Sequence, residues 1–244
     1  MFRLILLCCL VVANAVHLPE NFKLCSKKDP DFGNCVGTNM MDALSKLKDG
    51  NKNLGVPSLE PFSIDRMEIP GNEAASVNLN QNYKSVKFYG MSQGIAKNVK
   101  IDLENCHWSF NAISPKIQML SEYEMKGKLL VFPINGFGKS NTTMTDLDVR
   151  YEIDCSYNEK NGKKYMKFDK IKMNMKPGKV YFNFENLFPG NAQMSATLDK
   201  TVNENSEVVF NDVKSAFEEV FSQIWNNLAN SVLSKVPIDE IFLN

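Results

Sequence analysis

The segment between residues 211 and 242 carries a long apolar pattern that limits how this chain can fold. Its apolar residues form two columns with a spacing of four, which are Ala216, Val220, Ile224, Leu228, Val232 and Val236, and Phe217, Phe221, Trp225, Ala229 and Leu233. This spacing predicts an α-helix. Because an α-helix turns about 100° per residue, each step of four moves the stripe by roughly 40°. The apolar face therefore spirals around the predicted helix.

A spiralling apolar face favours a curved partner. A flat sheet covers a straight stripe on a helix, whereas a rotating stripe indicates a sheet that curls around it. We expect the N-cap at Asn211 or Asp212 and the end of the helix before Pro237, a length of about 36 Å. The alternative is an ordinary core helix on one flat layer.

The chain from Ala75 to Phe184 alternates apolar and polar residues with a period of two, which predicts β-strands with one buried face. Turn residues at Asn135 to Ser140, Asn161-Gly162 and Pro177-Gly178 indicate hairpins between neighbouring antiparallel strands. The expected fold class is α+β, with a strongly curved antiparallel β-sheet wrapped around the long C-terminal helix.

A second, shorter helix is expected after Cys35. Apolar residues at Val36, Met40, Leu44 and Leu47 have helical spacing, Thr38 or Asn39 can serve as the N-cap, and Gly50 can end the helix.

Residues 1–15 resemble a secretory signal peptide. Arg3 precedes an apolar run that ends in the small residues Ala13 and Ala15, and this run is too short to cross a bilayer. A membrane anchor is the alternative. We therefore expect a secreted, extracellular protein in which residues 16–244 form a single domain.

Four cysteines follow the predicted signal peptide, and an oxidising compartment favours two disulfides. Cys25 and Cys35 are close in sequence and are paired locally. Cys106 and Cys155 remain for each other, and both have the parity of the inward-facing residues of their strands, which supports the pairing.

The composition gives little support for catalysis or for nucleic acid binding. The formal net charge is zero, so there is no electrostatic argument for nucleic acid. The two histidines are His17, near the predicted mature N-terminus, and His107, whose parity places it on the wet face of its strand. The chain therefore has few histidine and free cysteine residues from which a metal site or a nucleophilic triad could be built. We expect no enzyme activity, no catalytic residue, no metal and no cofactor, and a hydrolase that uses His107 is a weak alternative.

The inward-facing positions are rich in aromatic residues and methionine. The candidate ligand-lining residues are Trp108, Phe110, Phe132, Tyr151, Met173, Phe182, Phe184, Phe217, Phe221 and Trp225. Such residues suit an adaptable apolar cavity, and they suit a solidly packed core equally well. Tyr151 or Tyr181 is a candidate to hold the polar head of a ligand.

Two surface features remain. Asn141-Thr142-Thr143 is an N-glycosylation sequon, expected on the predicted turn at Asn135 to Ser140. The lysine-rich stretch from Lys160 to Lys172 indicates a solvated hairpin face, with membrane docking as the alternative.

Several segments together resemble the takeout and juvenile-hormone-binding protein family of insects, which is part of the tubular lipid-binding superfamily. They are the Cys25 and Cys35 pair, GVPSLEPF at 55–62, FPINGFG at 132–138, NFENLFPGN at 183–191 and the ending PIDEIF after a long apolar helix. The resemblance covers nearly all of residues 16–244.

The resemblance implies a tunnel that holds one elongated apolar ligand, such as a terpenoid hormone (juvenile hormone), a fatty acid or an odorant. It favours a secreted monomeric carrier in haemolymph or another extracellular fluid, with a transient membrane or receptor contact. The alternative is a secreted signalling factor in feeding or circadian pathways that acts through its surface around a solid interior.

Overall fold

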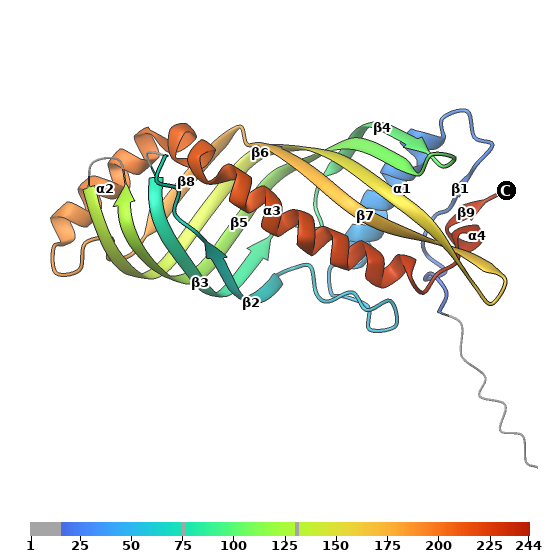
Figure 1. Cartoon of the computed structure of the whole chain (residues 1–244), viewed down its shortest axis with the longest axis horizontal. Helices are drawn as coiled ribbons and strands as arrows, with labels where there is room; N and C mark the ends of the chain where they lie inside the picture. The colour runs from blue at the N-terminus through green and yellow to red at the C-terminus, as the bar shows by residue number, and fades with distance from the viewer. Residues whose placement is uncertain (1–15, 75–76, 130–131) are drawn as a thin grey trace, which may run out of the picture.

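The computed structural model describes residues 16–74, 77–129 and 132–244. The predicted signal peptide, residues 1–15, lies outside the described residues. The molecule is elongated, and a strongly curved antiparallel sheet forms most of its length (Figure 1).

Seven strands make the main sheet. They are β2 (Phe62–Ile69), β3 (Val77–Tyr89), β4 (Ile95–Asp102), β5 (His107–Leu129), β6 (Phe132–Lys160), β7 (Lys163–Lys176) and β8 (Lys179–Phe184). The order is β2-β3-β5-β6-β7, with β4 also paired to β5 and β8 also paired to β6, and all these pairs are antiparallel. The expected antiparallel sheet is therefore confirmed, but it is not a simple meander, because β5 pairs with β3 as well as with β4, and β8 pairs with β6 and not with β7.

Two of the three predicted hairpin turns are wrong. Asn135 to Ser140 lies inside β6, where Ser140 pairs with Ser121 and Asn135 with Lys126 of β5. At Pro177-Gly178 the chain does not reverse, because β7 and β8 both run antiparallel to β6 along the same side of it. The Asn161-Gly162 turn is confirmed, since it joins Lys160 of β6 to its partner Lys163 and both turn residues have positive φ.

The glycines at Gly136 and Gly138 serve close packing and do not form a turn. A Cβ atom at Gly136 would lie 2.9 Å from the Leu187 Cα, and one at Gly138, where φ is +150°, would lie 2.9 Å from the Glu185 backbone oxygen. The segment after β8 therefore rests directly on β6. The glycines that suggested a turn are needed because two backbone segments, β6 and the segment after β8, lie very close to each other here.

The C-terminal helix begins earlier than expected. Helix α3 spans Ser206–Leu233 and follows α2 (Ala192–Glu204) after the single residue Asn205. Asn211 and Asp212 therefore lie inside α3 and do not cap it. The Asp212 carboxylate instead accepts a hydrogen bond from the Val77 backbone N–H at 2.9 Å. At 28 residues, α3 is about 42 Å long.

Helix α3 lies along the concave side of the sheet and bonds to strands near both of its edges (Figure 1). Asn230 bonds both backbone groups of Phe168 in β7, at 2.9 and 2.8 Å, and Glu218 accepts from the Met175 N–H. Asp212 bonds β3 as described. Side chains of α3 thus satisfy backbone groups that an open sheet would leave unpaired.

The spiral of α3 is visible in its burial. Val213, Phe217 and Phe221 are buried at steps of four, and the opposite face presents an exposed polar column with the same step: Asn211, Ser215, Glu219, Gln223 and Asn227. The sheet therefore covers a rotating face of the helix, and the remaining polar face meets solvent.

Helix α1 (Phe32–Lys46) lies at the other end of the molecule from α2 and packs against β4. It begins at Phe32, with Asp31 in the N-cap position, so Thr38 and Asn39 are interior residues. Beside α1, the short strand β1 (Cys25–Ser26) pairs in parallel with β9 (Phe242–Leu243), which directly follows α4 (Ile238–Ile241).

Both expected disulfides are present. Cys25 and Cys35 tie β1 to α1, and Cys106 and Cys155 join the turn before β5 to β6. Cys106 is buried and Cys155 is half-buried against the core, as their parity predicted.

Candidate functional site

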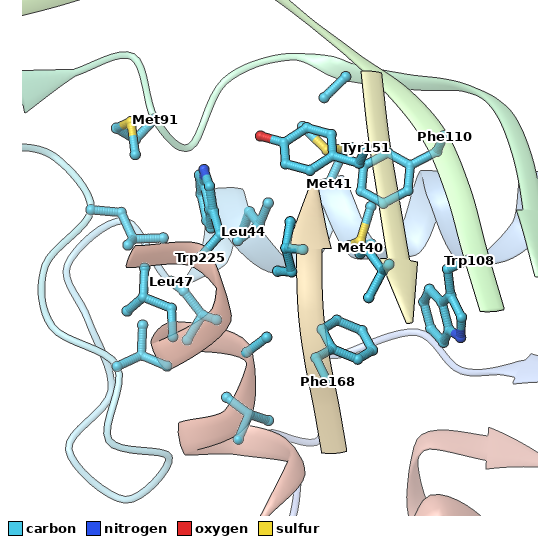
Figure 2. A pocket seen from close by; sticks show the side chains of 18 of the residues that line it. Met40, Met41, Leu44, Leu47, Met91, Trp108, Phe110, Tyr151, Phe168 and Trp225 are labelled. Carbon is cyan, nitrogen blue, oxygen red and sulfur yellow. The ribbon is translucent and has the colours of Figure 1, made fainter. Parts of the chain in front are cut away.

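An apolar cavity of about 230 Å³ beside α1 is called the principal cavity below; a larger hollow of about 600 Å³ lies over β3, β5 and β6, and its lining is largely polar and charged. The wall of the principal cavity combines Met40, Met41 and Leu44 of α1, Trp108 and Phe110 of β5, Tyr151 of β6, Phe168 of β7, and Trp225 and Ala229 of α3. Figure 2 shows these side chains converging from the helix, the strands and α3. No charged residue is among the described residues that line it.

Three further cavities form a row with the first along α3. A second cavity of about 230 Å³ lies toward the chain termini and is lined by Leu18, Phe22, Phe242 and an overlapping face of α1 that shares Met40 and Leu44 with the first cavity. In the other direction, cavities of about 60 and 30 Å³ continue under α3. Neighbouring cavities share lining residues, and their α3 residues run from Val209 to Leu233, a helix length of about 36 Å.

The candidate lining residues fall into distinct positions along this row. Trp108, Phe110, Tyr151 and Trp225 line the principal cavity. Met173, Phe217 and Phe221 line the narrow middle, and Phe182 and Phe184 line the small cavity near α2. Most of the room is therefore at the α1 end.

Phe132 and Tyr181 lie elsewhere. Phe132 is the first residue of β6 and lines none of these four cavities, although its partner Leu129 lines the small cavity near α2. Tyr181 is 44% exposed, with the Lys179 ammonium over its ring, so it cannot hold the head of an interior ligand.

Sequence reasoning missed the α1 wall. The spacing of Met40, Leu44 and Leu47 predicts the apolar face of an amphipathic helix, but no pattern in the sequence indicates which part of the sheet this helix covers. Leu228, Ala229 and Val232 of α3 are predicted only as members of the apolar stripe. These α1 and α3 residues line both of the 230 Å³ cavities, except Leu228, which lines the principal one.

Tyr151 supplies a polar atom inside the principal cavity. Its hydroxyl forms no hydrogen bond with another described residue, and its ring stacks on Phe110 with centroids 4.8 Å apart. Burial raises the pKa of the Tyr151 hydroxyl far above its ordinary value, so it stays protonated at physiological pH. In Figure 2 the hydroxyl points toward Trp225 and Met91.

His107 lies on the outer face, as its parity predicted. Its Nδ1 is 2.9 Å from Asp154 Oδ1 and its Nε2 is 3.1 Å from Glu152 Oε2, and the side chain is 46% exposed. Hydrogen bonding to Asp154, and secondarily to Glu152, raises the pKa of His107. The imidazole therefore belongs to a solvated charge cluster away from the cavity.

Replacing His107 with alanine should lower the free energy of unfolding by less than about 1 kcal/mol at pH 5 and leave it unchanged at pH 9. The folded-state pKa is raised, so the ion pairs stabilise the fold below the ordinary pKa of histidine and are lost as the pH rises through the folded value. Urea unfolding at both pH values measures this. An equal loss of unfolding free energy at pH 5 and pH 9 would contradict this prediction. A separate assay tests the hydrolase alternative, which would be supported if the protein cleaved esters and His107→Ala did not.

The lysine-rich face is paired with acidic residues on the neighbouring strand. Lys164, Lys170 and Lys172 of β7 lie opposite Glu159, Asp154 and Glu152 of β6. Such cross-strand pairs neutralise charge locally. The arrangement agrees with a solvated hairpin face, although Lys160 and Lys163 lie opposite each other next to the turn.

The sequon is on a strand and not on a turn. Asn141 is half-buried in the middle of β6, between Leu120 of β5 and Asn183 of β8. Its side-chain oxygen accepts hydrogen bonds from Gln118 and Thr143. The neighbouring residues Ser140 and Thr142 are buried, so Asn141 points to the outer face.

Within the described residues, no group of three or more histidine, cysteine, aspartate or glutamate side chains is arranged to hold a metal ion. In the same part of the chain, no helix combines the length and the apolar character needed to cross a membrane.

Comparisons with known proteins agree with the fold. Residues 4–243 match the family described as haemolymph juvenile hormone binding protein (JHBP). The circadian clock-controlled protein daywake of Drosophila melanogaster is 21% identical over 92% of this chain and 88% of its own length, and daywake of Drosophila yakuba gives the same values. The crystal structure of Takeout 1 from Epiphyas postvittana superposes with a TM-score of 0.80 and 21% identity, covering 91% of this chain and 99% of that one.

Proposed function

Because this chain belongs to the haemolymph juvenile hormone binding protein family, we propose that it is a secreted, non-enzymatic carrier that sequesters one elongated hydrophobic ligand in the cavities along α3. The observation that carries the proposal is the pair of apolar cavities of about 230 Å³ beside α1, which have hardly any charged lining. Terpenoid hormones such as juvenile hormone, fatty acids and odorants are the ligand classes of suitable size and chemistry.

The driving force is removal of apolar ligand surface from water. A ligand that buries about 400 Å² gains about 10 kcal/mol before ordering costs, at about 25 cal/mol per Å². After those costs, dissociation constants from micromolar to nanomolar are reasonable. The methionines Met40, Met41 and Met91 suit this task because thioether side chains repack at little cost.

Tyr151 is positioned to hold a polar head group. Its hydroxyl is inside the cavity, is protonated and has no partner among the described residues, so an oxygen atom of the ligand can complete its hydrogen bonding.

The purified protein should bind a fluorescent fatty acid analogue and release it when a long-chain terpenoid ester or fatty acid is added, with a dissociation constant in the micromolar range or below. Displacement titration measures this. Native mass spectrometry of the protein from its own source, followed by extraction, should identify a co-purified lipid. Failure of every long-chain lipid to compete would count against the carrier proposal.

The surface-acting alternative has less support. A signalling factor with a solid interior needs no cavity, whereas this interior contains two of about 230 Å³. The daywake relatives are named for control by the circadian clock, and that name does not specify a mode of action. A role in circadian rhythm or feeding would therefore concern the time at which the carrier acts, and it is compatible with ligand binding.

Passage through the secretory pathway would also make Asn141 a glycan acceptor. Its outward direction on β6 leaves the cavity unaffected, so we propose N-glycosylation there and a monomeric carrier.

A further inference from the structure

The indole N–H of Trp108 is a buried hydrogen-bond donor without an acceptor. Trp108 is 7% exposed, and its Nε1 is the one fully buried side-chain nitrogen or oxygen among the described residues that lacks a partner. Buried polar groups in folded proteins are nearly always paired, and an unpaired one costs free energy. Because other atoms cover the nitrogen, an acceptor from outside the chain could reach it only by displacing side chains in the wall that contains Trp108.

Trp108 stands in the wall between the two large cavities. It lines both of them, together with Phe168, whose ring meets the indole edge-on at a centroid distance of 5.5 Å. Phe242 approaches from the second cavity, with ring centroids 6.0 Å apart. In Figure 2 the nitrogen is on the side of the indole away from Phe168 and Met40. A ligand long enough to occupy both cavities must pass along this ring.

The lining also limits the charge of the ligand at this point. Among the residues that the structure describes, no charged side chain lines the principal cavity, and the one charged residue that lines the second cavity, Lys23, is exposed to solvent. A carboxylate next to Trp108 would thus be desolvated without a buried cation. A neutral oxygen, as in an ester, ketone or ether, needs only a donor, and indole N–H is a donor that cannot accept.

We propose that Trp108 Nε1 donates a hydrogen bond to a neutral oxygen of a ligand that joins the two cavities. Trp108 is then a specificity-determining residue that favours neutral oxygen-bearing lipids over hydrocarbons and ionised acids. This inference rests on the proposed carrier function. It assigns a role to a residue that would otherwise be better replaced by phenylalanine, which fills a similar apolar slot without an unpaired donor.

The test compares methyl palmitate, palmitate and nonadecane, which have similar chain lengths, on the full secreted chain. Wild-type protein should bind methyl palmitate more tightly than the other two. Trp108→Phe should weaken methyl palmitate about three- to tenfold more than it weakens nonadecane, because both lipids lose contact with the indole ring but only the ester loses a hydrogen bond. Phe168→Leu is the matched control, because Phe168 lines the same cavities without a polar atom and its loss should weaken both lipids alike.

The outcomes separate the two proposals. If wild-type protein binds none of the three lipids, the carrier proposal fails and this one fails with it. If it binds methyl palmitate and nonadecane, but Trp108→Phe weakens both equally or neither, the carrier proposal stands and the role of Trp108 is wrong.

A measurement on the wild-type chain makes the test independent of how the variant folds. The chain has two tryptophans, so ¹⁵N-labelled protein gives two indole N–H signals, and Trp225→Phe assigns them. Methyl palmitate should move the Trp108 indole proton downfield, and nonadecane should not. A shift of equal size with both lipids, or with neither, would overturn the proposal.

Discussion

Ala229→Phe is expected to weaken binding of long-chain lipids about a hundredfold while the protein stays folded. Ala229 lines both of the large cavities from α3, and its small side chain leaves the space between Trp108, Phe168 and α1 open. A phenyl ring there would exclude roughly 100 Å² of ligand surface, worth about 2.5 kcal/mol. That loss corresponds to nearly two orders of magnitude in the dissociation constant. Displacement titration measures it.

The cost of this substitution to the fold should be small. A larger side chain usually destabilises a packed core, but here it enters a hollow, so we expect the free energy of unfolding to change by less than about 1 kcal/mol. Asn227→Phe is the control, because Asn227 is exposed on the outer face of α3 and should leave binding intact. Full-affinity binding by Ala229→Phe would show that the ligand does not occupy these cavities.

Removing the disulfide between Cys106 and Cys155 by replacing both with alanine should lower the free energy of unfolding by about 4 kcal/mol. The two cysteines are 49 residues apart, and closing a loop of that length restricts the unfolded chain strongly. Removing the disulfide between Cys25 and Cys35, which are 10 residues apart, should cost less, about 2.5 kcal/mol.

Urea unfolding of the two double variants under the same conditions compares these losses. The prediction covers which of the two losses is larger as well as the size of each loss, because the loop length determines both. A larger loss for the Cys25 and Cys35 variant would mean that native contacts of β1 and α1, and not the unfolded chain, dominate the effect.

Much of the fold was predictable because its signals are local. The alternation in β5 and β6 placed Trp108, Phe110 and Tyr151 inward, and the same parity placed His107 outward and paired Cys106 with Cys155. Periodicity depends only on neighbouring residues, so no knowledge of the partner strand was needed.

The errors occurred where a residue type has more than one use. Glycine at positions 136 and 138 suggested a turn, but it allows residues 185–187 to rest on β6. Pro177-Gly178 suggested a reversal, but it separates two strands that continue along one edge. Asp212 suggested a helix cap, but it bonds the end of β3. In each case, the deciding contact is with a distant segment.

The sequence by itself determined which side chains point inward, and the spiralling apolar face of the helix favoured a curved sheet over a flat one. The sequence left open whether the interior is solid or hollow, and only the tertiary structure decided this. A cavity is the difference between the volume that the backbones enclose and the volume that the side chains fill. That difference depends on how α1, β5, β6 and α3 approach one another. Phe217 and Phe221 therefore border a cavity of only about 60 Å³, whereas Trp108, Tyr151 and Trp225, with the same inward pattern, border one of about 230 Å³.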